Sequence, residues 1–167
     1  MKLSDGIEQA VHSVTMLASL EDGQVLSAAA LATFHGVSPS YLLKHLQALS
    51  RARILATVPG PKGGYHMAKK PERVTLFDIV IAIEGSQPAF RCKEIRRNGP
   101  NPLPDKAFTA PCQINAAMLR AEQSYRNELR KVTIASLLEQ LSEEDRDGAI
   151  TRRACAFLEG HVRASKT

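Results

Sequence analysis

The chain has 167 residues and is 44% hydrophobic, which suffices for one domain with a real core, or for a small domain with an extension. It lacks an apolar run near the ~20 residues that span a bilayer, and Met1 to Leu20 is not a secretory signal. We therefore expect a cytoplasmic protein with no membrane partner. The formal net charge of +5 is common among nucleic-acid binders but is weak evidence by itself.

The first third of the chain predicts three helices. Apolar residues at helical spacing indicate a first helix from about Ser4 to Leu20. A short alanine-rich helix from Ala28 to Phe34 should then end at Gly36. Ser38 and Pro39 form a typical helix start, and the helix they open should run to about Arg53. Two helices joined by a tight turn with a glycine predict a helix-turn-helix.

A β-hairpin is expected directly after the third helix. Ile54 to Val58 is rich in strand-forming residues, and Tyr65 to Ala68 should return beside it. The connecting loop, Pro59 to Gly64, combines proline and glycine with the basic Lys62. Such a hairpin behind a recognition helix is a wing, and its glycines allow a phosphate to approach the backbone.

The second half of the chain has a different pattern. Thr75 to Gly85 predicts a helix, and Ser86 to Pro111 is a proline-rich loop of a length that is usually functional or disordered. Ile114 to Leu141 predicts one helix of ~40 Å, suited to crossing an equivalent helix in a two-fold dimer. Glu143 to His161 should form a last polar helix.

The expected fold class is therefore mainly α with a small β-wing. We divide the chain into a winged helix-turn-helix domain (1–85), a loop (86–112), a dimerisation helix (113–142) and a C-terminal polar helix and tail (143–167).

Candidate DNA-binding residues follow from this arrangement. The N-terminal end of the second helix of such a motif reaches base edges, and the wing reaches the backbone or the minor groove. Lys44 suits guanine, while serine hydroxyls suit bases or phosphates. We expect His45 to face the DNA side as well. The predicted DNA-binding residues are Ser38, Pro39, Ser40, Tyr41, Lys44, His45, Lys62 and Tyr65.

Four residues form a second candidate site, for a metal. Glu8 and His12 are one helical turn apart and point the same way. Cys92 and Cys112 bracket the proline-rich loop. An odd number of cysteines in a chain expected in the cytoplasm argues against a disulfide framework and leaves metal binding, redox sensing or burial.

Each of these residues has a simpler explanation. With Asp5 as N-cap, Glu8 would complete a capping box, and His12 could be a partly buried helix residue. Cys92 and Cys112 could be buried apolar residues or a reversible thiol pair. We interpret Cys155, which is far from both in sequence, as structural or incidental.

The chain resembles a family of dimeric winged-helix regulators that includes IscR and NsrR. The resemblance extends from Met1 to about Gly85 and includes five matching stretches, Met1–Ser4, Val37–Leu42, Gly60–Tyr65, Thr75–Val80 and Ile83–Gly85. The common iron–sulfur members carry three closely spaced cysteines after the Glu-Gly step, whereas here Cys92 stands alone until Cys112. In this respect the chain is similar to the RsrR-type members.

The resemblance implies a homodimeric, DNA-binding transcription regulator that senses redox state through a [2Fe–2S] cluster. The ligands would be Cys92 and Cys112 with His12 and Glu8, contributed by two subunits, and the loop 86–112 would bind the cluster. The first alternative is a cluster-free regulator of the same fold that uses a Cys92–Cys112 thiol switch or an effector-binding partner. A second is an iron–sulfur handling or electron-transfer protein. An enzyme is least expected, since no nucleophile–base pair or cofactor fingerprint is present.

Overall fold

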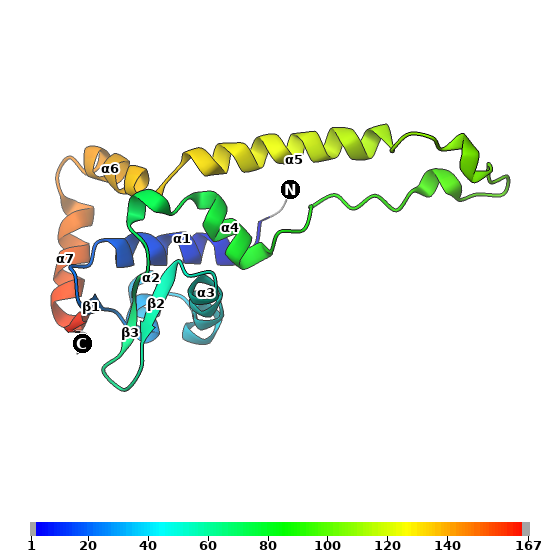
Figure 1. Ribbon diagram of the computed structural model, residues 1–167. Helices are drawn as coiled ribbons and strands as arrows, with labels where there is room; N and C mark the ends of the chain where they lie inside the picture. The colour runs from blue at the N-terminus through cyan, green and yellow to red at the C-terminus, as the bar shows by residue number, and fades with distance from the viewer. Residues whose placement is uncertain (1–2, 165–167) are drawn as a thin grey trace.

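The computed structural model describes residues 3–164 as a helical body from which a long arm projects (Figure 1). The body contains α1 (Asp5–Ala18), α2 (Ala28–His35), α3 (Pro39–Arg51) and α4 (Leu76–Glu84). The arm consists of the loop 86–112 and α5 (Gln113–Lys131), and the chain then returns through α6 (Ile134–Glu144) and α7 (Ala149–His161). The predicted fold class, mainly α with a small β-wing, is confirmed.

The helix-turn-helix forms where the caps predicted it. The Ser27 hydroxyl accepts a hydrogen bond from the Ala30 amide at the start of α2, and Gly36 ends that helix in the left-handed conformation with φ of 65°. Pro39 occupies the first position of α3. The inward leucines of α3 are fully buried together with side chains of α1 and α2, so that this aliphatic core fixes the recognition helix: Leu42, Leu46, Leu49, Val14, Leu17 and Leu31.

The wing is the antiparallel hairpin of β2 (Leu55–Val58) and β3 (Gly64–Met67). A second small sheet pairs β1 (Gln24–Val25) with β4 (Arg163–Ala164). The residue after β1, Leu26, exchanges two backbone hydrogen bonds with Tyr65 of the wing, of 3.1 and 2.8 Å. The wing is thus joined to the body by backbone pairing as well as by side chains.

The prediction of a single long helix from Ile114 to Leu141 is wrong. The chain leaves helical geometry at Val132 and Thr133, whose backbones are extended, and Thr133 caps a new helix. The physical reason is a backbone pairing with the segment before α4. The Leu76 amide donates to the Val132 carbonyl and the Ile134 amide donates to the Val74 carbonyl, each at 2.9 Å. α6 therefore folds back onto α1, and α7 begins only after Gly148.

Gly64 allows the wing to approach the body closely. A Cβ atom there would lie 2.4 Å from the Leu26 carbonyl oxygen, whereas a Cβ at Gly160 in α7 would meet open space. Gly64→Ala should therefore lower the free energy of unfolding by about 1–3 kcal/mol, because the backbone must shift. Gly160→Ala, the matched control, should raise it by up to ~1 kcal/mol through helix propensity. Urea unfolding measures both, and equal effects of the two substitutions would contradict this account.

Candidate metal centre and nucleic-acid interface

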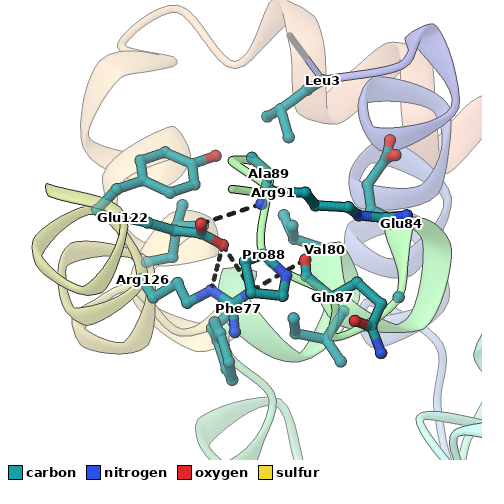
Figure 2. A pocket seen from close by; sticks show the side chains of 14 residues that line it. Leu3, Phe77, Val80, Glu84, Gln87, Pro88, Ala89, Arg91, Glu122 and Arg126 are labelled. Carbon is teal, nitrogen blue, oxygen red and sulfur yellow. Dashed lines mark hydrogen bonds and ion pairs between the residues drawn. The ribbon is translucent and has the colours of Figure 1, made fainter. Parts of the chain in front are cut away.

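The arm is held at its base by a partly buried ion pair of α5. Arg126 binds Glu122 at 2.7 Å, and its guanidinium also donates to the Gln87 carbonyl (Figure 2). The same nitrogen donates to the Ser86 carbonyl at 3.0 Å. Glu122 accepts a further hydrogen bond from the Ala89 amide at 3.0 Å. These contacts tie the start of the loop to α5 beside a cavity of about 460 Å³. They determine the direction in which the loop leaves the body.

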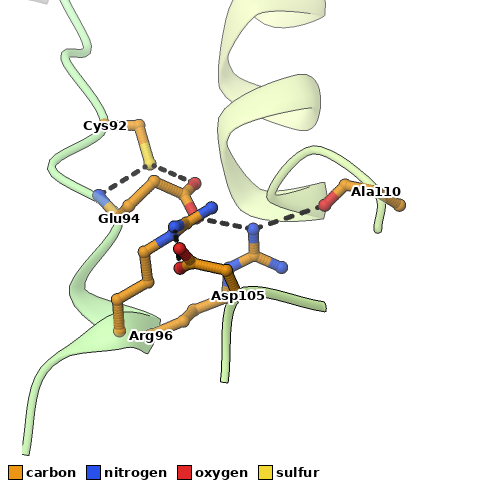
Figure 3. A network of polar contacts seen from close by, with 6 residues as sticks. Cys92, Glu94, Arg96, Asp105 and Ala110 are labelled. Atoms are coloured by element: carbon orange, nitrogen blue, oxygen red, sulfur yellow. Dashed lines mark hydrogen bonds and ion pairs between the residues drawn. The ribbon is translucent and has the colours of Figure 1, made fainter. Parts of the chain in front are cut away.

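Farther along the arm, Cys92 and Cys112 meet across the loop. One ligand atom each of Cys92, Glu94 and Cys112 lies within 4.8 Å of the other two. The Cys92 thiol donates to a Glu94 carboxylate oxygen at 3.3 Å, and the Glu94 amide approaches the same sulfur at 3.4 Å (Figure 3). Two soft sulfur atoms and one carboxylate oxygen thus form a donor set that thiophilic metal ions use.

Arg96 orients this group of donors. Its guanidinium binds the other Glu94 carboxylate oxygen at 2.7 Å and reaches the Ala110 carbonyl at 3.4 Å, just before Cys112 (Figure 3). One arginine therefore links the two strands of the loop that carry the cysteines. All three cysteines of the chain are free thiols, and Cys155 is exposed on α7 away from this contact.

The two thiols have opposite electrostatic environments. Cys112 is buried at the N-cap of α5, where the first amides of that helix, above all that of Asn115, and the Arg96 charge lower the pKa of its thiol. At Cys92 the Glu94 amide lowers the pKa, but the Glu94 carboxylate, burial and neighbouring charges together raise it above its usual value. Cys112 is thus the sulfur more readily converted to a thiolate.

Sequence reasoning missed Glu94. Glutamate is a common surface residue, and a Cys-x-Glu spacing has no special meaning in an extended loop. Glu94 reaches the sulfur because its own backbone is left-handed, with φ of 48°, a conformation that few residues other than glycine adopt. The sequence therefore carries no signal that singles out Glu94 as a neighbour of the cysteines.

Glu8 and His12 lie elsewhere in this chain. Both are exposed on α1, and within residues 3–164 neither side chain makes a hydrogen bond or ion pair. The capping-box explanation of Glu8 is wrong, because Ser4 is the N-cap and its hydroxyl donates to Glu84 at 2.6 Å. The alternative of a partly buried His12 is also wrong. Within one chain the structure brings the two cysteines together but does not bring α1 to them.

The N-terminal end of α3 presents the predicted DNA-binding residues to solvent. The exposed ones are Ser38, Pro39, Ser40, Tyr41 and Lys44. The hydroxyls of Ser38 and Ser40 lie 3.1 Å apart. Lys62 is exposed at the tip of the wing loop. These side chains are free to contact bases and phosphates.

His45 and Tyr65 do not match the expected exposed positions. The His45 ring packs against Gly6 of α1 and lies edge-on to Tyr41, with ring centroids 4.6 Å apart, and burial lowers its pKa. The start of α1 thus partly covers His45, and its contact with DNA stays a prediction. Tyr65 is half-buried against the core, and burial raises its pKa. Contact of Tyr65 with DNA likewise stays a prediction.

Comparison with known proteins agrees with this architecture. A family model described as "Rrf2: Iron-dependent Transcriptional regulator" matches residues 3–140. The chain belongs to the Rrf2 family. It is 32% identical over 140 residues to YffB of Lactococcus lactis, which carries the name of an HTH-type transcriptional regulator; the match covers 84% of this chain and 88% of YffB. This family consists of transcription regulators, not enzymes.

Two solved structures share the Rrf2 fold. CymR, the global cysteine regulator of B. subtilis, has a TM-score of 0.65 at 18% identity over 84% of this chain and 98% of CymR. T. potens IscR has a TM-score of 0.64 at 20% identity over 86% of this chain and 90% of IscR. Between residues 3 and 164, no helix is both long and apolar enough to cross a membrane.

The opposite pKa shifts of the two thiols have a measurable consequence. In metal-free protein, the pH at which alkylation by iodoacetamide is half-maximal should be lower for Cys112 than for Cys92, because the thiolate is the reactive form. Mass spectrometry of the two cysteine peptides gives a separate pH profile of alkylation for each thiol. The midpoint of each profile does not depend on how accessible the thiol is to the reagent. Arg96→Ala should raise the Cys112 midpoint. A Cys92 midpoint at or below that of Cys112 would contradict the electrostatic account.

Proposed function

We propose that this Rrf2-family protein is a homodimeric, DNA-binding transcription regulator that senses redox state through a [2Fe–2S] cluster. Cys92 and Cys112 of one protomer and Glu8 and His12 of the other would hold the cluster. The observation that carries the proposal is the meeting of the two thiols, 20 residues apart, at the N-terminus of α5. The description of the family as iron-dependent and the similarity of the fold to T. potens IscR also support the proposal.

The residues fit such a cluster chemically. Thiolates are the usual ligands of iron–sulfur clusters, and two non-cysteine ligands on one iron have a precedent in Rieske centres. The environment of Cys112 favours its thiolate. Glu8 and His12 are exposed and point the same way, and neither makes a side-chain hydrogen bond or ion pair within residues 3–164. A carboxylate is the hardest of these donors, so Glu8 is the weakest member of the set.

A second protomer supplies what one chain lacks. α5 has 19 residues, and none of them is buried. Three of its large apolar side chains are exposed: Ile114, Met118 and Leu119 are 67, 44 and 39% exposed. An isolated helix with such an apolar face is poorly stable in water and needs a partner surface. The arm projects beyond the N-terminal end of α1 (Figure 1). We propose that α5 pairs with its equivalent and carries the cysteines toward the partner's α1.

A [2Fe–2S] cluster supplies a one-electron change in charge. In this chain the His12 ring lies 5.8 Å from the ring of His35, the last residue of α2. The ligand-bearing face of α1 therefore contacts the first helix of the helix-turn-helix. A shift of α1 would be passed to the turn that positions α3, a coupling of the kind by which small local changes reorient packed elements.

A cluster-free thiol switch is the second candidate. Cys92 and Cys112 are in contact without any residue of α1, so an oxidant such as a peroxide could remove two electrons and two protons and join the sulfurs as a disulfide. The loop would then be locked at the foot of α5. An effector-binding partner is a further cluster-free alternative.

Metal analysis distinguishes these candidates. Protein purified without oxygen should hold about two irons and two sulfides per chain. Cys92→Ala and Cys112→Ala should each abolish the cluster and leave a folded protein, whereas the matched control Cys155→Ala should retain it. His12→Ala should alter the visible spectrum more than Glu8→Ala. No cluster after reconstitution, with a disulfide forming on oxidation, would favour the thiol switch.

DNA binding tests the second part of the proposal. In anisotropy titrations, Lys44→Ala should relax base preference, whereas Lys62→Ala should weaken binding to all sequences alike. Oxidised and reduced protein should differ in operator affinity by at least about tenfold, or roughly 1.4 kcal/mol of coupling. Equal affinities of oxidised, reduced and cluster-free protein would leave a constitutive DNA binder.

A further inference from the structure

The family match ends at residue 140, yet the chain beyond it is firmly packed on the body. Side chains of α7 and of Val162 lie against the hydrophobic core. Phe157 packs on Phe34 of α2, with ring centroids 5.0 Å apart. Arg153 stacks over the same Phe34 ring at 4.7 Å and donates to the Phe34 carbonyl at 3.3 Å. The C-terminal segment is therefore held against the helix-turn-helix.

Because of this packing, the C-terminal end of the described chain lies beside the wing. β4 pairs antiparallel with β1, so that Arg163 lies opposite Val25. The next residue after β1, Leu26, pairs with Tyr65 of β3. In Figure 1 the wing loop, β1 and the C-terminal end of the described chain lie on the same lower side of the body as α3. The C-terminal strand thus lies one strand away from the hairpin that the winged helix offers to DNA.

Arg163 itself contacts the tip of the wing. Its Nη1 donates to the Pro61 carbonyl at 2.9 Å, next to the exposed Lys62. A guanidinium has five N–H donors, and the described residues take up one of them here. Within residues 3–164 no carboxylate pairs with Arg163. A positive charge with free donors is therefore fixed on the loop that meets DNA.

We infer that Arg163 is a DNA-phosphate-binding residue, and that the C-terminal α7–β4 segment adds it to the wing as a second cationic contact beside Lys62. The ligand is a backbone phosphodiester rather than a base edge, because Arg163 is held on the wing loop and not on α3, the helix whose N-terminal end reads bases. Phosphate contacts of this kind set affinity and register without reading sequence. The inference rests on the proposed DNA binding.

The test is a salt titration of DNA binding. A labelled duplex of random sequence, about 30 base pairs long, is titrated with Arg163→Gln, Arg163→Lys and wild-type protein at several KCl concentrations. Each lost phosphate contact should reduce the slope of log affinity against log salt by about 0.9, and should lower affinity near 0.1 M salt about five- to tenfold. Arg163→Lys keeps the charge and should keep the slope.

Arg152→Gln is the matched control, because Arg152 lies at the start of α7 and donates to the Asp147 carbonyl. It should leave affinity and slope unchanged. A wild-type slope for Arg163→Gln would overturn the inference while leaving DNA binding intact. So would an equal loss of affinity in the Gln and Lys variants without a change of slope, which indicates that Arg163 only holds the wing. Failure of the wild-type protein to bind any duplex would instead refute the proposed function.

Discussion

The short backbone pairing between Val74–Leu76 and Val132–Ile134 is the constraint on which the arm depends. Two hydrogen bonds join these segments, and on each side a threonine begins a helix with a capping box, Thr75 for α4 and Thr133 for α6. The C-terminal end of the arm is therefore fixed at the start of α4, while Arg126 holds its N-terminal end at Ser86 and Gln87. The Glu122–Arg126 pair and Arg130, stacked 3.6 Å over the Phe77 ring, then hold α5 beside α4. Every residue of the candidate metal centre on the arm is positioned from this base.

At the far end of the arm, polar contacts take the place of a hydrophobic core. Cys112 is buried there, whereas Ile95, Leu103 and Ile114 of the same arm remain exposed. The loop is closed by Arg96, which spans Glu94 and the Ala110 carbonyl. Surface ion pairs of this kind contribute little stability by themselves. The same site therefore combines reactive sulfur atoms, an exposed apolar surface and a loop that is held together by weak contacts. In the function we propose, a second protomer buries this surface and provides the missing ligands.

The surface that we propose binds DNA is shaped by the packing of apolar side chains behind it. The α3 leucines fix the recognition helix, while His45 is covered by Gly6 and so orients Tyr41 from behind. Gly64 lets the wing approach Leu26 within backbone hydrogen-bonding distance. The exposed lysines therefore stand on a rigid support. A rigid support favours DNA binding, because side chains that are already placed lose less conformational freedom on association.

The sequence by itself determined the local elements: helix caps, the glycine turn, the wing and the aliphatic core all follow from side-chain periodicity and from the conformations that serine, proline and glycine favour. It also singled out Cys92 and Cys112 as a pair. Tertiary structure decided what periodicity cannot encode. The apolar stripe from Ile114 continues through Val132, and only pairing with Val74 breaks the helix there. Glu94 joined the cysteines through a left-handed backbone, the start of α1 partly covers His45, and the distance between α1 and the cysteines depends on where the arm points. Each of these results from contacts between residues far apart in the chain, which local sequence patterns do not contain.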